Sequence, residues 1–185
     1  MQRYTEALFD RPVLHSQRLV LRVPTEHDIP AIIAIAGDWE IASRLARMPH
    51  PYSAAEASFF LDTIVPAELV WLIVERSSNL VVGCIGIARD DDSPETVELG
   101  YYVARAHWGR GIATEAGSVI LAYGIGLLGR SRITSGHFAD NPASGRVLEK
   151  LGFSRAGLSE RPCLALGGSK PSIEMRLAGC EQGAQ

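Results

Sequence analysis

Hydrophobic and polar positions follow two different periods along this chain, and together they predict a mixed α/β fold. Runs rich in β-branched and aromatic residues, which are typical of strands, occur at 18–23, 69–76, 80–88, 97–104, 132–138, 154–160 and 173–177. Apolar residues at helical spacing indicate helices at about 25–37, 38–46, 53–64, 111–127 and 141–152. Residues 1–14 show no clear period, and we interpret them as a loose lead-in.

Two of the predicted helices begin with residues that satisfy free backbone N–H groups. Ser53 and Glu56 have the spacing of a full capping box, in which each side chain bonds the other residue's backbone. Asn141 stands at a cap position before Pro142, and proline is tolerated at the first helical position because its missing N–H has no partner there anyway. We therefore expect helices to begin just after Ser53 and Asn141.

Composition narrows the class of protein. The chain has 185 residues with no internal repeat and no linker, so we expect residues 1–185 to form a single domain with a core at about 14–178. A formal charge of −3 argues against general affinity for nucleic acids or acidic membranes. There is no signal-peptide pattern and no apolar run of 18 residues, and we expect a cytoplasmic protein.

Cysteines and histidines give no sign of a metal site. Cys84, Cys163 and Cys180 lack the spacing of zinc ligands, and we expect them to be reduced thiols. The five histidines lie far apart in the sequence, without ligand spacing. We therefore predict no metal.

The most informative stretch is 97–116, which is predicted to run from a strand through a glycine turn into a helix. Gly109 and Gly111 stand two residues apart, just before the predicted helix. Glycine permits positive φ and lets a ligand approach the backbone closely. The start of a helix offers free N–H groups and the positive end of its dipole. This arrangement predicts an anion site at 109–114, with phosphate as the favoured anion.

Three phosphate-binding patterns compete for this turn. A Walker loop is excluded because the chain has no Gly-x-x-x-x-Gly-Lys-Ser/Thr run. A dinucleotide fingerprint fits Gly109 and Gly111 but has Thr114 in its third position, and Arg130 and Arg132 lie where an acidic residue is expected. Because two arginines suit a 2′-phosphate, NADP stays open as an alternative at this point.

The third pattern is the coenzyme A loop of the GNAT superfamily, Gln/Arg-x-x-Gly-x-Gly/Ala. It fits at Gly111 and Ala113, with Trp108 in the position of the basic residue. Segments 98–102 and 108–116 together resemble the central signature of the RimJ/RimL-type branch, which commonly carries Trp-Gly there. Further resemblance lies in Asn141-Pro142-Ala143-Ser144, in Leu151-Gly152-Phe153 and in Arg18-Leu19-Val20-Leu21-Arg22. The similarity covers roughly residues 14–178.

This resemblance implies a fold, a reaction and a co-substrate. The fold would be a central, mostly antiparallel sheet of six to seven strands, flanked by helices and splayed between the fourth and fifth strands, 97–104 and 132–138. The activity would be transfer of an acetyl group from acetyl-CoA to a primary amine, on a protein N-terminus or a small molecule, without a metal. Homodimers are common in the family.

The resemblance also implies which residues hold the co-substrate. The pantetheine arm would bond the backbone of the fourth strand, at Tyr102, Val103 and Ala104. The diphosphate would bond N–H groups of the glycine turn, at Gly109, Arg110, Gly111, Ile112, Ala113 and Thr114. Asn141 would cap its helix and also contact the co-substrate.

Acetyl transfer to an amine needs a group that removes a proton. A lysine amine is neutral only at about the 0.1% level at pH 7, and a positioned base typically contributes about 10² to 10⁴-fold. Glu98, which shares a strand face with Gly100 and Tyr102, is our first candidate for this base, acting directly or through water. A purely structural carboxylate at the rim of the sheet is an equal alternative, and Glu160 is a second candidate base.

The departing thiolate needs a proton or a hydrogen bond, which many family members supply from a tyrosine. This chain has Leu148 at that position, and Ser144 is the substitute that the RimJ/RimL-type resemblance implies. Because a thiol has a pKa near 8.5, a hydrogen bond can suffice at neutral pH. The missing tyrosine also leaves open a different function, a GNAT-fold sensor that binds acyl-CoA without turning it over.

Overall fold

The computed structural model describes residues 2–8, 11–89, 93 and 95–177. Within these ranges Cys84 and Cys163 are buried thiols that form no disulfide, as expected. Cys180 lies outside the described residues, so the expectation for it stays a prediction.

An eight-stranded sheet forms the centre of the molecule, in the order β1-β2-β3-β4-β5-β6-β8-β7. All neighbouring strands run antiparallel except β5 and β6. The mixed fold with a mostly antiparallel sheet is thus confirmed, and all seven predicted strands are present. The eighth, β1, has only two residues, too few to show an alternating pattern. The strands are β1 Leu14–His15, β2 Leu19–Arg22, β3 Leu69–Glu75, β4 Leu80–Arg89, β5 Val97–Val103, β6 Ile133–Phe138, β7 Phe153–Cys163 and β8 Gly168–Leu177.

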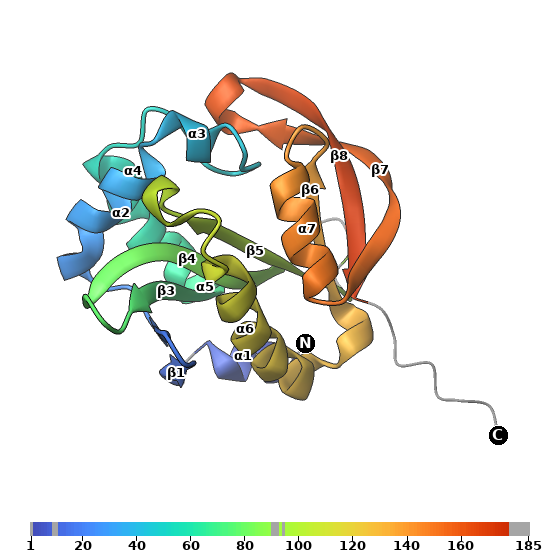
Figure 1. Cartoon of the computed structure of the whole chain (residues 1–185), viewed down its shortest axis with the longest axis horizontal. Helices are drawn as coiled ribbons and strands as arrows, with labels where there is room; N and C mark the ends of the chain where they lie inside the picture. Colours follow the sequence, from blue (N-terminus) through green and yellow to red (C-terminus); the bar gives the residue numbers. More distant parts are fainter. Residues whose placement is uncertain (1, 9–10, 90–92, 94, 178–185) are drawn as a thin grey trace.

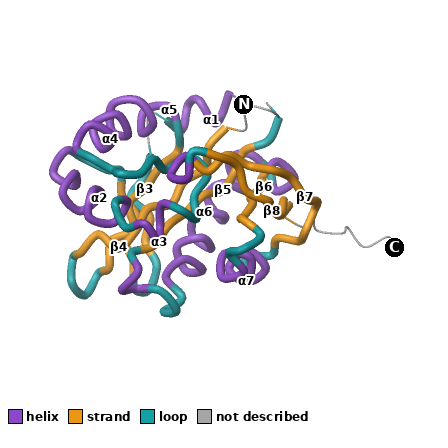
Figure 2. Tube along the Cα trace, turned by 90° about the horizontal axis from the view of Figure 1, so that it is seen from above, coloured by secondary structure: helices purple, strands orange, loops and turns teal. Residues whose placement is uncertain are grey.

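Helices lie on both sides of the sheet (Figure 2). They are α1 Gln2–Ala7, α2 Ile29–Ala36, α3 Trp39–Ala42, α4 Ala54–Phe59, α5 Val65–Ala67, α6 Ile112–Leu128 and α7 Pro142–Lys150. A π-helical turn, Phe60–Ile64, joins α4 to α5, and 3-10 turns lie at Glu26–Asp28, Arg105–His107, Arg130–Arg132 and Leu164–Leu166. In the part of the chain that the structure describes, no helix combines the length and apolarity needed to cross a bilayer.

The predicted caps are present at the starts of α4 and α7. The Ser53 hydroxyl accepts from Ala55 N at 3.1 Å, and Ser53 N donates to a carboxylate oxygen of Glu56 at 2.8 Å. Asn141 Oδ1 accepts from Ser144 N at 3.2 Å. These bonds satisfy donors that a helix start otherwise leaves free.

Alternate residues of β3 build the two hydrophobic cores. Leu69, Trp71 and Ile73 pack on one face, together with α6 and α7 residues, while Val70, Leu72 and Val74 pack on the other face, together with α2 and α4 residues. Because successive side chains of a strand point to opposite faces, an apolar strand buried on both faces holds the two layers of helices in fixed positions.

The parallel strands β5 and β6 are paired by backbone hydrogen bonds at one end only. Their paired positions are Val97 with Ile133 and Glu98 with Thr134. At the next position a side chain makes the link between the strands in place of a backbone pair: Ser135 Oγ donates a hydrogen bond to Leu99 O at 2.8 Å. Beyond this point the strands separate, with α6 and α7 alongside (Figure 1). This is the splay that was expected between the fourth and fifth predicted strands.

The expectation of a loose lead-in is wrong for residues 2–7, which form α1. Tyr4 is fully buried, and its hydroxyl donates to Ile87 O at 2.7 Å. A helix this short draws its stability from tertiary packing rather than from a repeating pattern, so the sequence carries little local signal for it.

Candidate active site

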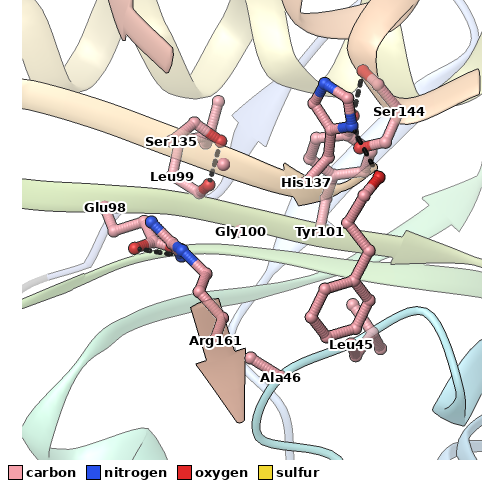
Figure 3. A pocket seen from close by; sticks show the side chains of 12 residues that line it. Leu45, Ala46, Glu98, Leu99, Gly100, Tyr101, Ser135, His137, Ser144 and Arg161 are labelled. Atoms are coloured by element: carbon pink, nitrogen blue, oxygen red, sulfur yellow. Dashed lines mark hydrogen bonds and ion pairs between the residues drawn. The ribbon is translucent and has the colours of Figure 1, made fainter. Parts of the chain in front are cut away.

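A small cavity lies where β5 and β6 separate (Figure 3). It offers about 80 Å³ of space. Its walls come from 98–101 on β5, 135–138 on β6, Ser144 on α7, Arg161 on β7 and the loop residues 45–46. Glu98 and Ser144, the two predicted catalytic residues, therefore line the same cavity.

This cavity reaches both faces of the sheet. Tyr102 packs against the core on the α2 and α4 face, whereas Leu99, Tyr101 and Val103 belong to the core on the α6 and α7 face. By strand alternation, Glu98 shares the face of Tyr102, opposite to Tyr101. The cavity therefore has side chains from both faces of the sheet in its wall.

Glu98 is held by an arginine that the sequence analysis did not predict. Arg161 Nη1 lies 2.7 and 2.8 Å from the two carboxylate oxygens of Glu98. The same guanidinium binds Glu174 on β8, with Nε 2.8 Å from Oε1 and Nη2 paired to Oε2. Chiefly through the hydrogen bond to Glu174, the pKa of Arg161 is raised above its ordinary value. One cation is therefore shared by two carboxylates, which leaves the cluster with a formal charge of −1.

Gly136 makes this arrangement possible. A Cβ added at Gly136 would lie 2.8 Å from Cζ of Arg161, which is closer than carbon atoms can approach. The guanidinium therefore lies against the bare backbone of β6 on its way to Glu98. Arg161 stands 63 positions from Glu98 in the sequence, so no local pattern connects the two.

The shared cation predicts a loss of stability in acid. The hydrogen bond with Arg161 lowers the pKa of Glu174 below its ordinary value of 4.5, against the opposing effect of burial. A depressed carboxylate pKa stabilises the fold above the unfolded-state pKa, and this contribution is lost as the pH falls through the folded-state pKa. We expect Glu174→Gln to be less stable than wild type near neutral pH, with the difference shrinking as the pH falls below about 4.5.

Urea unfolding of the two proteins at a series of pH values measures this difference. The matched control is Glu95→Gln, because the Glu95 side chain is 78% exposed in its pair with Arg132 and a solvated pair contributes little. A difference between wild type and Glu174→Gln that stays constant with pH would contradict the prediction.

At the other end of the cavity, Ser144 meets a second hydroxyl that the sequence analysis missed. Tyr101 Oη lies 2.7 Å from Ser144 Oγ and 3.2 Å from Ser144 O. Burial raises the pKa of Tyr101 to about 12. Leu148, at the position of the family's tyrosine, is fully buried in the core. Strand alternation was the available signal, since Tyr101 lies on the opposite face from Glu98.

Backbone direction along β5 decides which amides face the gap. Ala104 N donates to Val82 O at 2.8 Å, on the side of β4, and successive residues of a strand alternate in this direction. Tyr102 and Ala104 therefore direct their backbone groups toward β4, while Tyr101 and Val103 direct theirs toward the gap. Val103 O already accepts from Trp108 Nε1 at 2.7 Å. The amides available to a ligand are those of Tyr101 and Val103, a shift of register from the expected Tyr102–Ala104.

The glycine turn has the conformation that its sequence requires. Gly109 and Gly111 have φ of 73° and 77°, in the left-handed region, and α6 begins directly after Gly111. The N–H groups of the first turn, from Ile112 to Thr114, have no partner within the helix. Free N–H groups at a helix start of this kind favour an anion, and the anion site itself stays a prediction.

The two arginines near this turn have different partners. Arg110 reaches away to Glu75, with 3.1 Å between Nη2 and Oε1. Arg18 was not predicted, and its Nε lies 2.6 Å from Oε2 of Glu115, while its Nη1 donates to Arg110 O at 3.0 Å. Arg18 therefore ties the turn to β2 and places a cation beside it.

Glu160 lies outside the cavity. It is exposed on β7, where it pairs in register with Pro171, and it is absent from the cavity wall. Of the two candidate bases, only Glu98 lines the cavity between β5 and β6.

Comparison with known proteins identifies the family. A family model described as an acetyltransferase (GNAT) domain matches residues 18–154. This chain belongs to the GNAT acetyltransferases. Over 152 residues it is 32% identical to the N-acetyltransferase YoaA of Bacillus subtilis (strain 168), covering 80% of this chain and 85% of that protein.

Solved structures agree at the level of the fold. Spermidine N-acetyltransferase from Vibrio cholerae, in complex with CoA and spermine, superposes with a TM-score of 0.72 at 20% identity, covering 86% of this chain and 95% of that one. RimL, a ribosomal L7/L12 alpha-N-protein acetyltransferase in complex with coenzyme A, gives 0.73 at 17% identity, covering 89% and 96%. GNAT acetyltransferases use acetyl-CoA as donor. The NADP alternative does not fit, because a dinucleotide fold requires a mostly parallel sheet.

Proposed function

We propose that this GNAT enzyme transfers an acetyl group from acetyl-CoA to a primary amine by direct attack in a ternary complex. The observation that carries the proposal is the cavity through the sheet, which has Glu98 on one face and Ser144 with Tyr101 on the other. Two substrates that enter from opposite faces meet there without a covalent enzyme intermediate.

The donor would enter on the face of α6 and α7. The N–H groups from Gly109 to Thr114 would hold its diphosphate, since a helix start favours an anion. The backbone groups of Tyr101 and Val103 that face the gap would bond its pantetheine arm as a neighbouring strand does. Arg18, paired with Glu115, holds the turn in place through its bond to Arg110 O, and Asn141 acts by capping α7 through its bond to Ser144 N.

The acceptor would enter on the face of Glu98, next to the loop of residues 45–46. Glu98, Arg161 and Glu174 carry a combined formal charge of −1 there, which favours a cationic amine over an acid. The cavity is small, with about 80 Å³ of space. We therefore propose an acceptor with a slender end, such as a peptide N-terminus or a terminal amine of a small molecule.

In this reaction Glu98 takes a proton from the ammonium form of the acceptor, directly or through a water. The neutral nitrogen then bonds to the acetyl carbon as the carbon–sulfur bond breaks. The electron pair of that bond stays on sulfur, where Ser144 donates a hydrogen bond. The nitrogen loses its second proton to solvent as the amide forms, and solvent protonates the thiolate. After the amide and the thiol leave, Glu98 returns its proton to solvent, so atoms and charges balance.

Thiol release from acetyl-CoA, measured against a panel of amines, tests the proposal. The panel includes peptide N-termini, polyamines and lysine analogues. We expect at least one amine to raise thiol release well above hydrolysis by water, with formation of the matching amide. Binding of acetyl-CoA without turnover for any amine would favour the sensor function instead.

A further inference from the structure

Tyr101 and Ser144 present two hydroxyl groups to one end of the cavity, from different elements. Tyr101 comes from β5 and Ser144 from the first turn of α7, and their oxygens lie 2.7 Å apart. Both residues line the cavity (Figure 3). The pair lies on the donor face, where the thioester sulfur would stand in the proposed reaction.

The hydrogen bonds of this pair have two possible arrangements. In one, Ser144 donates to Tyr101 and the phenol donates to Ser144 O at 3.2 Å, which uses both protons. In the other, the phenol donates to Ser144 Oγ, and the serine proton then has no acceptor among the described residues. A negative charge that develops in the cavity selects the second arrangement, because a donor then faces it.

The position of Ser144 in α7 also favours a negative charge beside its hydroxyl. It is the third residue of the nine-residue α7, whose start is capped by Asn141. The positive end of the helix dipole stabilises an anion at this point. Hydroxyls linked in a chain also polarise one another, which strengthens the last donor.

We propose that Tyr101 is a positioning residue that directs the Ser144 hydroxyl toward the leaving sulfur, in place of the tyrosine that Leu148 replaces on α7. The proposal rests on the acetyl transfer described above. The carbon–nitrogen bond forms as the carbon–sulfur bond breaks, and sulfur keeps the electron pair. Ser144 donates a hydrogen bond to that charge while it is itself held by the phenol, and the thiolate is later protonated by solvent.

Hydrogen bonding, rather than proton transfer, is the role that these groups support. Burial raises the pKa of Tyr101 to about 12, far above the roughly 8.5 of a thiol. The phenol therefore keeps its proton at any working pH. The pair therefore donates a hydrogen bond without losing a proton, so neither hydroxyl has to be reprotonated after each turnover.

The ionisation of bound coenzyme A tests the proposal independently of turnover, since a thiolate absorbs in the ultraviolet and a thiol does not. In wild type we expect the hydrogen bond to shift the ionisation of bound coenzyme A downward by about one pKa unit. In Tyr101→Phe and in Ser144→Ala we expect it to return to the value of free coenzyme A.

Turnover gives the second readout. We expect Tyr101→Phe to lower kcat roughly 10- to 100-fold, because the Ser144 hydroxyl is then no longer directed at the charged sulfur and that charge-assisted hydrogen bond is lost, while KM for acetyl-CoA stays within about twofold. The double variant with Ser144→Ala should lose little more than either single one, because the two hydroxyls act as a unit. Tyr4→Phe is the matched control, since it removes a buried phenol outside the cavity; it should keep both kcat and the thiol shift.

Each alternative outcome has a distinct meaning. If Tyr101→Phe keeps the kcat and the thiol ionisation of wild type, the positioning role is overturned while acetyl transfer stands. A variant that loses only thermal stability or KM, with kcat unchanged, overturns it equally. A wild type that acetylates no amine overturns the proposed function and this inference with it.

Discussion

Glu98→Gln is expected to lower kcat by about 10² to 10⁴-fold with an acceptor that has the basicity of lysine. Glutamine keeps the shape of the side chain and still accepts a hydrogen bond from Arg161, but it cannot take a proton from the acceptor ammonium. The deficit should shrink as the pH rises toward roughly 10.4, where a lysine-like amine becomes neutral in solution. It should also be smaller for a peptide N-terminus, whose pKa is about 8. Steady-state rates across pH with the two acceptor types measure this.

Glu160→Gln is the matched comparison, because it removes a carboxylate that lies outside the cavity on β7. It should retain the wild-type rate at each pH. The opposite pattern, with Glu160→Gln inactive and Glu98→Gln unaffected, would reverse the assignment of the base. Equal retention of rate in both would leave Glu98 as a structural partner of Arg161.

The second large effect is expected at the glycine turn, where Gly111→Val should weaken acetyl-CoA binding roughly 100-fold. Gly111 has a φ of 77°, and a side chain in this region costs about 1–2 kcal/mol, more for a β-branched residue. The turn must therefore change conformation, and the added side chain meets the approaching diphosphate. Calorimetric titration measures the loss, which corresponds to about 2.7 kcal/mol.

Two comparisons separate diphosphate binding from general damage to the fold. Acetyl-pantetheine, which lacks the diphosphate, should bind wild type and Gly111→Val with similar affinity. Gly126→Ala changes an exposed glycine of the same helix whose added Cβ meets nothing within 4 Å. It should leave the affinity unchanged and stabilise the protein by about 0.5–1 kcal/mol. Equal loss for both ligands in Gly111→Val would indicate misfolding instead.

Local sequence patterns predicted most of the fold because most of its elements have a strong period. β3 and β4 are long apolar runs, and α4 and α7 carry their own caps at Ser53 and Asn141. α1 was missed for a physical reason. It is held by the burial of Tyr4 against the sheet, and a tertiary contact of this kind leaves no mark on a six-residue segment.

The same distinction, between local sequence patterns and tertiary contacts, separates the predicted from the missed residues of the candidate site. The conformation of the glycine turn was predictable because it depends on consecutive residues, Gly109 and Gly111 before the helix start. Glu98 was chosen for its place on the strand before the turn, and Ser144 was implied by the resemblance of 141–153 to the RimJ/RimL-type branch. Arg161 and Tyr101 were not found, because Arg161 acts on Glu98 from β7, at the edge of the sheet, and Tyr101 acts on Ser144 from another element. Strand alternation could place Tyr101 on the face opposite Glu98, but contacts between residues of different elements, such as these two, appear only when the elements are assembled.

The structure of the complex with acetyl-CoA tests the central claim most directly. The account predicts that the diphosphate oxygens lie within hydrogen-bond distance of the N–H groups from Gly109 to Thr114, with the thioester between β5 and β6 and its sulfur next to Ser144 Oγ. A diphosphate bound at another surface, or a thioester outside the gap between β5 and β6, would contradict it.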